Sequence, residues 1–396
     1  MPRDLARYLL CCVSALGVLV SSDGAQAKTK TYQVLHSFNN NVGGNEPVAG
    51  LIEDANGNFY GTTAGTRMGE DGTVFILPAG SKRPKFLHTF TGGGTDGSDP
   101  YAGVIMDKAG NLYGTTVGGG DGETSEGAVY MIDPKGKETL LHSFDGGSDG
   151  TFPYAGVVMD SAGNLYGTTT LGGTSSKGIA YKLAPDGTET VLHTFTGGSD
   201  GGEPVAGLIL DKKGNLYGTA FYGGANDDGV VFELAAGGKE TVLYSFKGGS
   251  DGANPYAGSL IADTAGNFYG MTYAGGAKAD GTVYELKRDG TETVLHSFAG
   301  GSDGAAPFAG LIMDSAGNLY GTTQSGGMTC NGMGSGCGTV FKLTPDGTET
   351  VLHAFKGGLD GIEPSCTLFA DGAGNLYGTT TYGGLYFSGT IFTIKE

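Results

Sequence analysis

Gly317-Asn318-Leu319-Tyr320-Gly321-Thr322-Thr323 is one copy of a motif that decides the fold, because it recurs at a long and nearly constant interval. Its asparagine stands at positions 58, 111, 164, 215, 267, 318 and 375, so the chain of 396 residues holds seven copies spaced by about 52 residues. A fixed period of this length is typical of solenoids, propellers and related repeat architectures.

Three other segments keep step with the motif. They resemble Val-Leu-His-Ser-Phe at 294–298, Ala-Gly-Leu-Ile-Met-Asp at 309–314 and Thr-Val-Phe-Lys-Leu at 339–343. Each is short, rich in β-branched and aromatic residues and bounded by turn residues, which is the pattern of a strand. Ser-Ala-Gly-Asn at 315–318 and Pro-Asp-Gly-Thr at 345–348 are hairpin signals. Each repeat therefore predicts four antiparallel strands.

The order of these strands favours a closed ring over an open β-solenoid. We expect the Ala-Gly-Leu-Ile-Met-Asp segment to be the innermost strand A, followed outward by B, C and the His-bearing strand D. The chain begins with a lone D strand, 32–38, and ends with a C strand, 390–394. The N-terminal strand can then complete the last blade. We predict an all-β, seven-bladed β-propeller that forms a single domain over residues 28–396.

The N-terminus has the pattern of a signal peptide over residues 1–27. Arg3 and Arg7 precede an apolar stretch, 8–20, and the small-residue site Ala25-Gln26-Ala27 follows. We expect a secreted protein, periplasmic or extracellular, that has no membrane association after cleavage. The net charge of −18 argues against nucleic acid and anionic lipid, because both need clustered Lys and Arg. We expect a monomer that attracts cations, basic proteins or neutral polar ligands.

The repeat resembles the GloVer-type tandem repeat of exported bacterial proteins. The resemblance is carried by Leu-His-Ser-Phe, Gly-Gly-Ser-Asp-Gly, Asn-Leu-Tyr-Gly-Thr-Thr and the Tyr-Gly-Gly at 382–384, in fixed order over nearly all of the mature chain. It implies extracellular placement and a repeat fold, and it implies no activity.

All six histidines fall at one position of strand D, where the remaining repeat has Tyr244. They are His36, His88, His142, His193, His296 and His353. Equivalent residues of a ring lie far apart, so we interpret these histidines as packing residues between blades. The same interpretation applies to the tyrosines of the Asn-Leu-Tyr-Gly motif.

The Gly-Gly-Ser-Asp-Gly loop carries an aspartate in six repeats, with Gly43 in the first. These aspartates are Asp96, Asp149, Asp200, Asp251, Asp303 and Asp360. An Asp before Gly commonly folds onto its own backbone as an Asx-turn. The alternative is a Ca²⁺ site, although each loop lacks the several spaced acidic ligands that calcium prefers. No other cofactor is indicated.

Cys330 and Cys337 bracket a glycine-rich insertion. Export makes a local disulfide between them the favoured interpretation, since a zinc site would need two further ligands and no histidine lies nearby.

The D–A and B–C loops should emerge together on one face, the top, where the repeats differ most. Aromatic residues follow a recurring proline there, and acidic residues precede it. The candidate ligand-binding residues are Tyr101, Tyr154, Tyr256, Phe308, Glu46, Asp99, Glu203 and Glu363. Aromatic faces beside carboxylates suit sugar rings; alternatively, the aromatics only plug the channel.

The motifs name no catalytic residue. There is no Gly-x-Ser-x-Gly elbow, no metal-spaced His/Cys cluster and no phosphate loop. The favoured interpretation is a binding or scaffold module for a polar ligand, a glycan or a protein. The alternatives are a carbohydrate-active hydrolase or lyase that uses a carboxylate pair, and a purely structural matrix protein.

Overall fold

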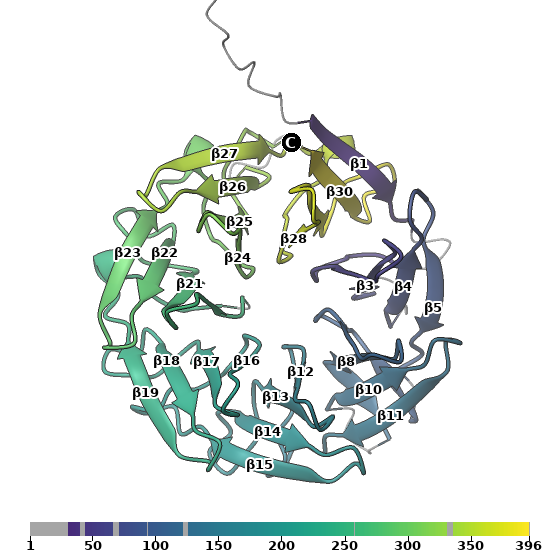
Figure 1. Cartoon of the computed structure of the whole chain (residues 1–396), viewed down its shortest axis with the longest axis vertical. Coiled ribbons are helices and arrows are strands. Elements are labelled where there is room, and N and C mark those ends of the chain that lie inside the picture. The colour runs from purple at the N-terminus through teal and green to yellow at the C-terminus, as the bar shows by residue number, and fades with distance from the viewer. Residues whose placement is uncertain are drawn as a thin grey trace, which may run out of the picture.

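The computed structural model describes residues 31–39, 44–65, 71–92, 94–121, 126–256, 258–330 and 336–395. The predicted signal peptide and Gly43 lie outside them. Seven four-stranded antiparallel sheets stand around a common axis as the blades of a ring (Figure 1). The predicted fold, a seven-bladed β-propeller, is confirmed.

Each blade takes its strands A to D from the inside outward, and blades 1 to 7 follow the chain. Strands A are β2 (Ile52–Glu53), β7 (Ile105–Met106), β12 (Val158–Met159), β16 (Ile209–Leu210), β20 (Ile261–Ala262), β24 (Ile312–Met313) and β28 (Phe369–Ala370). Strands B are β3 (Phe59–Thr63), β8 (Leu112–Thr116), β13 (Leu165–Thr169), β17 (Leu216–Ala220), β21 (Phe268–Thr272), β25 (Leu319–Thr323) and β29 (Leu376–Thr380).

Strands C and D complete the blades. Strands C are β4 (Thr73–Leu77), β10 (Ala128–Ile132), β14 (Ile179–Leu183), β18 (Val230–Leu234), β22 (Thr282–Leu286), β26 (Thr339–Leu343) and β30 (Thr390–Lys395). Strands D are β5 (Lys85–Thr89), β11 (Glu138–Ser143), β15 (Glu189–Thr194), β19 (Glu240–Ser245), β23 (Glu292–Ser297), β27 (Glu349–Ala354) and, for blade 7, β1 (Thr31–Ser37). The loops add the ribbon β6 (Asp96–Ser98) with β9 (Gly118–Gly120), and the 3-10 turns Gly249–Asp251, Gly301–Asp303 and Gly358–Asp360.

The N-terminal strand closes the ring as expected. Strand β1 pairs with β30 in the order β1-β30-β29-β28, so the first and last segments share blade 7 (Figure 1). The ring of Tyr32 in β1 stacks on His353 of blade 6, with centroids 3.7 Å apart. Because β1 pairs with the outer edge of β30, the backbone hydrogen-bonding groups on that edge of β30 are not left open where the first and last segments of the chain meet.

Strand A is shorter than predicted. The sequence suggested six residues, yet only two of them pair with strand B in each blade. The Ala-Gly half bonds to the preceding blade instead: the Thr115 hydroxyl donates to the Ala155 carbonyl at 2.9 Å, and the Thr379 hydroxyl to the Ala49 carbonyl at 3.1 Å. The approach is close enough that a Cβ on Gly50 would lie 2.7 Å from a carbonyl oxygen of blade 7.

The core lies between blades. Phe195 at the end of β15 packs on Phe232 of the next blade, with centroids 5.1 Å apart, and the equivalent pairs recur around the ring. Gly218 of the Asn-Leu-Tyr-Gly motif has no room for a side chain, because a Cβ there would lie 2.7 Å from the Phe232 ring. The motif glycine therefore allows the aromatic core to form. None of the described residues forms a helix long and apolar enough to span a bilayer.

Candidate functional site

A cavity of about 560 Å³ lies where the inner segments of all seven blades converge. Its wall is built from the residues that follow the recurring proline and from the Ala-Gly segments of strand A. We call this cavity and the side chains at its rim the channel mouth. It is the concave surface that the scaffold offers to a ligand.

The four predicted aromatic residues all line the channel mouth. Tyr101 and Tyr154 come from blades 2 and 3 and have their ring centroids 5.4 Å apart. Tyr256 and Phe308 come from blades 5 and 6, with centroids 4.4 Å apart. Tyr154 remains 40% exposed, so its ring is open to solvent and is not sealed in a hydrophobic plug.

The residue before the recurring proline adopts a left-handed backbone in every blade. These residues are Glu46, Asp99, Phe152, Glu203, Asn254, Ala306 and Glu363, with φ between 53° and 57°. A left-handed backbone costs free energy for residues other than glycine, and it persists only where the surrounding structure enforces it. Two backbone hydrogen bonds do so here: the Glu363 N–H donates to the Cys337 carbonyl, and the Glu363 carbonyl accepts from Thr381 N–H, both at 3.0 Å.

The structure separates the four predicted acidic residues. Glu46 and Glu363 line the cavity. Asp99 and Glu203 do not, although they occupy equivalent backbone positions. Glu203 instead forms an ion pair with Lys177 at 3.0 Å.

Acidic residues at the channel mouth and beside it lie close enough to influence one another electrostatically. Burial raises the pKa of Glu363, and the charge of Glu46 raises it further. Burial also raises the pKa of Asp99, followed by the charges of Asp71 and Glu46. The pKa of Tyr101 rises to about 12, first through burial and then through Asp99. Tyr101 therefore lies near acidic residues as well as near Tyr154.

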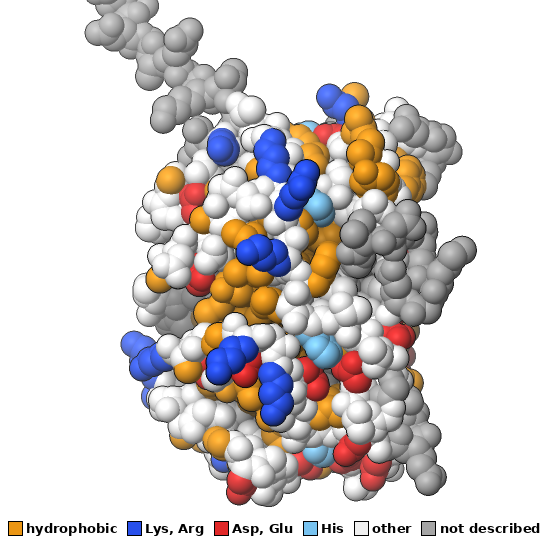
Figure 2. All heavy atoms as spheres, turned by 90° about the vertical axis from the view of Figure 1, so that its right-hand side faces the viewer, with side chains coloured by type: hydrophobic (Ala, Val, Ile, Leu, Met, Phe, Trp, Pro, Cys, Tyr) orange, Lys and Arg blue, Asp and Glu red, His pale blue; other side chains and the backbone are white. Residues whose placement is uncertain are grey.

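The histidines lie on the outer strands, and five of the six pair with the aspartate of the following loop, whereas the Nδ1 of His36 lies 2.9 Å from the Lys82 carbonyl oxygen. We call these D strands and their pairs the outer wall. The Nε2–carboxylate distances run from 3.1 to 3.4 Å in His88–Asp96, His142–Asp149, His193–Asp200, His296–Asp303 and His353–Asp360. Tyr244 replaces histidine and donates to Asp251 at 2.6 Å. Figure 2 shows histidine side chains at intervals along this wall.

The loop aspartates also hold their own backbone. In blade 5, one oxygen of Asp303 accepts the Ala299 N–H at 2.6 Å, while the other faces His296. Among the described residues, no group of three or more His, Cys, Asp or Glu is arranged to hold a metal ion. Calcium at these loops stays a prediction, and it would have to compete with both bonds.

The histidine–aspartate pairs were not predicted from the motifs. Their signal was present, because the two residues stand seven or eight positions apart in five repeats. The glutamates that begin the outer strands were not predicted as titratable sites either. Burial raises the pKa of Glu189 and of Glu349 to about 7, and the charge of an aspartate in the preceding blade, Asp149 and Asp303 respectively, contributes to the rise.

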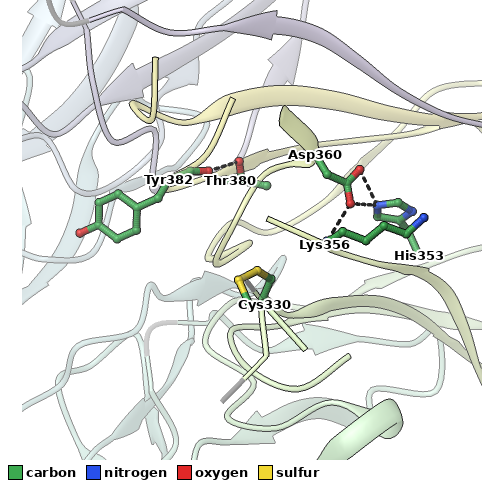
Figure 3. The surroundings of a disulfide bond; sticks show 7 residues. Cys330, His353, Lys356, Asp360, Thr380 and Tyr382 are labelled. Atoms are coloured by element: carbon green, nitrogen blue, oxygen red, sulfur yellow. Dashed lines mark hydrogen bonds and ion pairs between the residues drawn. A yellow bond between two sulfur atoms is a disulfide. The ribbon is translucent and has the colours of Figure 1, made fainter. Parts of the chain in front are cut away.

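Cys330 and Cys337 form a disulfide across the B–C loop of blade 6, with Cα atoms 5.2 Å apart. Residues 331–335 between them lie outside the described part of the chain. Figure 3 shows where the disulfide lies relative to the outer wall and the cavity. On one side of it the Asp360 carboxylate faces His353, and on the other side Tyr382, which lines the cavity, points away from that pair.

Solved propellers share the fold. The extracellular domain of a B. thetaiotaomicron protein assigned as a one-component system is 12% identical with a TM-score of 0.58, over 91% of this chain and 40% of that one. A Bacteroides uniformis protein assigned as a 6-phosphogluconolactonase is 14% identical with a TM-score of 0.52, over 81% of this chain and 88% of that one. This chain therefore spans less than half of the first structure. Likeness at such identity shows the fold alone.

No curated protein matches the sequence. The profile of the Gloeobacter/Verrucomicrobia repeat matches residues 16–220, which are 205 of the 396 residues. The resemblance expected from the repeat motifs is thereby confirmed: the chain belongs to the family of the Gloeobacter/Verrucomicrobia repeat.

Proposed function

We propose that the protein is a secreted propeller that binds a polar extracellular ligand, a glycan, at the channel mouth. One observation carries the proposal: a cavity of about 560 Å³ is lined by five aromatic side chains and two carboxylates that several blades contribute. A sugar ring offers an apolar CH face to an aromatic ring and hydroxyls to carboxylates. The N-terminal signal-peptide pattern supports export, and the net charge of −18 supports a ligand other than nucleic acid.

The proposal is tested by calorimetric titration of residues 28–396 with soluble oligosaccharides. Tyr154→Ala and Tyr256→Ala should each weaken binding by about tenfold, which is about 1.4 kcal/mol for a stacked ring. Tyr386→Ala is the matched control, because Tyr386 is 52% exposed and lies outside the cavity lining. If no oligosaccharide binds, or if Tyr386→Ala weakens binding as much as the other two variants, the proposal is wrong.

A hydrolase or lyase is the second candidate, and the raised pKa of Glu363 favours it. A buried carboxyl beside a second carboxylate is the arrangement in which one group acts as a general acid. Incubation with the bound oligosaccharide should then release new reducing ends, and Glu363→Gln should abolish that release. Binding without turnover would leave the protein as a binding module.

A further inference from the structure

In every blade the residue that follows strand B is hydrogen-bonded to the residue before the recurring proline. In blade 7 the Thr381 N–H donates to the Glu363 carbonyl at 3.0 Å, and the equivalent bond recurs in the other six blades at 3.0–3.2 Å. The two side chains of each pair therefore start from neighbouring points of the backbone. Which chemical groups they bring together depends on the residue types in that blade.

Blade 7 is the one blade that places a hydroxyl next to a carboxylate here, and the structure describes both positions in all seven blades. The carboxylates of blades 1, 2 and 4 stand next to the apolar residues Ala64, Val117 and Phe221. The hydroxyl of Thr170 in blade 3 stands next to Phe152. The combination in blade 7 therefore breaks the repeat, and a need common to all blades does not explain it.

The Thr381 hydroxyl is buried at the cavity without a partner. Thr381 lines the cavity and is 6% exposed, and its side-chain oxygen forms no hydrogen bond within the described part of the chain. Glu363 lines the cavity too, and burial raises the pKa of its carboxyl group, because the charged form has lost part of its water. A ligand that hydrogen-bonds to both groups would recover part of the cost of burying them.

Two adjacent hydroxyl groups on a ligand would satisfy both side chains. A carboxylate only accepts hydrogen bonds, whereas a threonine hydroxyl both donates and accepts. One ligand hydroxyl can therefore donate to Glu363 while its neighbour pairs with Thr381. An anionic group at the same place would be repelled by Glu363. Tyr382, the next residue, also lines the cavity and points away from the His353–Asp360 pair (Figure 3), so an aromatic face belongs to the same part of the wall.

We infer that Glu363 and Thr381 form a diol-binding subsite of the channel mouth, which takes a neutral glycan through two adjacent hydroxyl groups of one sugar ring. The inference rests on the proposed function and narrows its ligand from glycans in general to neutral ones. It also assigns specificity to Thr381, a residue that lies outside the segment of the recurring proline.

The test measures the affinity of residues 28–396 for four tetrasaccharides by calorimetric titration. Cellotetraose, xylotetraose and mannotetraose are neutral and have adjacent hydroxyls on every ring, whereas tetragalacturonate adds a carboxylate to every ring. We expect at least one neutral tetramer to bind, and tetragalacturonate to bind at least about tenfold more weakly than that tetramer, because its carboxylates are repelled by Glu363.

Variants of Thr381 locate the effect. Thr381→Val removes the hydroxyl and should weaken binding of the neutral tetramer by about fivefold, the effect of one hydrogen bond, whereas Thr381→Ser should stay within about twofold of the wild-type protein. Thr170→Val is the matched control, because its hydroxyl is also buried and unpaired at the equivalent position but lies outside the cavity lining. It should leave the affinity unchanged. Neither valine variant should melt below the wild-type protein, because each loses an unpaired hydroxyl.

Glu363→Gln tests the second member of the subsite. It should weaken binding of the neutral tetramer by about tenfold and reduce the discrimination against tetragalacturonate. Because Glu363 and Thr381 hold the same diol, the Glu363→Gln/Thr381→Val variant should lose less affinity than the product of the two single losses.

Each other outcome overturns the inference in a recognisable way. If Thr381→Val binds like the wild-type protein, if Thr170→Val weakens binding as much, or if tetragalacturonate binds as tightly as the neutral tetramers, the inference is wrong but the proposed glycan site stands. If the two single losses multiply in the double variant, the residues hold separate groups and the diol assignment is wrong. If none of the four tetramers and no other oligosaccharide binds, both the inference and the proposed function are wrong.

Discussion

The outer wall and the channel mouth are built from the same repeat, yet different features recur in them. The side chains recur at the outer wall, whereas the backbone conformation recurs at the channel mouth. On the outer wall the same side chains recur in most blades: Tyr244, which replaces a histidine, keeps the bond to its aspartate, and only His36, whose loop has Gly43 in place of the aspartate, bonds to the Lys82 carbonyl instead. At the channel mouth the backbone conformation recurs, because all seven residues before the recurring proline are left-handed. Their side chains differ from blade to blade, for example a carboxylate in Glu46 and a methyl group in Ala306.

We infer from this difference that the outer wall serves the fold and that the channel mouth serves the function. A side chain that recurs in nearly every blade serves a need that every blade has, such as holding a loop to its strand. A constant backbone with differing side chains provides a rigid frame on which a specific surface is displayed. The predictions below test this division, and they run from the largest expected loss of stability to the smallest.

Deletion of β1 tests the wall at its seam. A chain that starts at Phe38 loses the partner of β30 and the stacking of Tyr32 on His353. We expect the free energy of unfolding to fall by more than the roughly 3–5 kcal/mol of one buried aromatic side chain, with aggregation through the exposed strand edge. Thermal unfolding and size-exclusion chromatography measure both effects. A chain that starts at Thr31 is the control, and equal stability of the two would contradict the closure.

Removal of the disulfide tests a loop at which the repeat is interrupted. Cys330 and Cys337 are seven residues apart, and closing a loop of that size contributes about 2.5 kcal/mol on the chain-entropy estimate. The Cys330→Ser/Cys337→Ser variant should unfold at lower denaturant concentration with an unchanged slope. The wild-type protein under reducing conditions should show the same midpoint, and a midpoint that does not move would contradict the prediction.

A single wall position should cost slightly less. Asp303→Ala leaves the Ala299 N–H and the His296 ring without their acceptor, which we expect to lower the free energy of unfolding by about 1–3 kcal/mol. Asp303→Asn retains a side-chain oxygen and should cost less than half as much in urea unfolding. Equal losses in the two variants would show that the pair is not held by these bonds.

The repeat explains why the architecture could be predicted and much of the wall could not. The position of each motif in the period predicts the strand order within a blade. The lone D strand at 32–38 and the final C strand at 390–394 predicted that the N-terminal strand completes the last blade, and the pairing of β1 with β30 confirms it. The pair between His296 and Asp303 depends on how the D–A loop folds back on its own strand. Periodicity alone does not specify that, so the loop aspartates were compared only with turns and calcium sites.

The candidate site was predictable in part for a similar reason. The fixed place of the proline put Tyr101 and Phe308 near the axis, and the structure places both there. The acidic residues share that place as well, but their surroundings differ. Glu203 is paired because Lys177 lies in the preceding blade, which no spacing within the repeat indicates.

The pH dependence of stability tests whether the glutamates at the start of the outer strands are buried as the structure shows. Burial raises the pKa of Glu189 and of Glu349 to about 7, above the value near 4.3 of an unfolded chain. The native state therefore holds these protons more strongly, so the stability they contribute is complete below about pH 4.3 and is lost as the pH rises through 7. The melting temperature should fall between about pH 5 and pH 8. Glu189→Gln/Glu349→Gln should flatten that fall, whereas a rise in the wild-type protein would contradict the assignment.

The smallest stability effect is expected at the mouth. Tyr154 is 40% exposed, so Tyr154→Ala should change the free energy of unfolding by no more than about 0.5 kcal/mol, as is usual for surface positions. Urea unfolding checks this value. A loss of 2 kcal/mol or more would mean that the Tyr154 ring is part of the core and that this residue of the mouth serves the fold.

The most direct test of the division between wall and mouth is backbone hydrogen exchange, measured by mass spectrometry with and without a saturating oligosaccharide that binds the protein. We predict slower exchange in the segments around and after the recurring proline, 101–105, 154–158 and 363–368, and unchanged exchange in the outer strands β11, β15 and β23. Slower exchange confined to those outer strands would contradict it, because the ligand would then be held by the repeated surface rather than by the one at which the repeat differs.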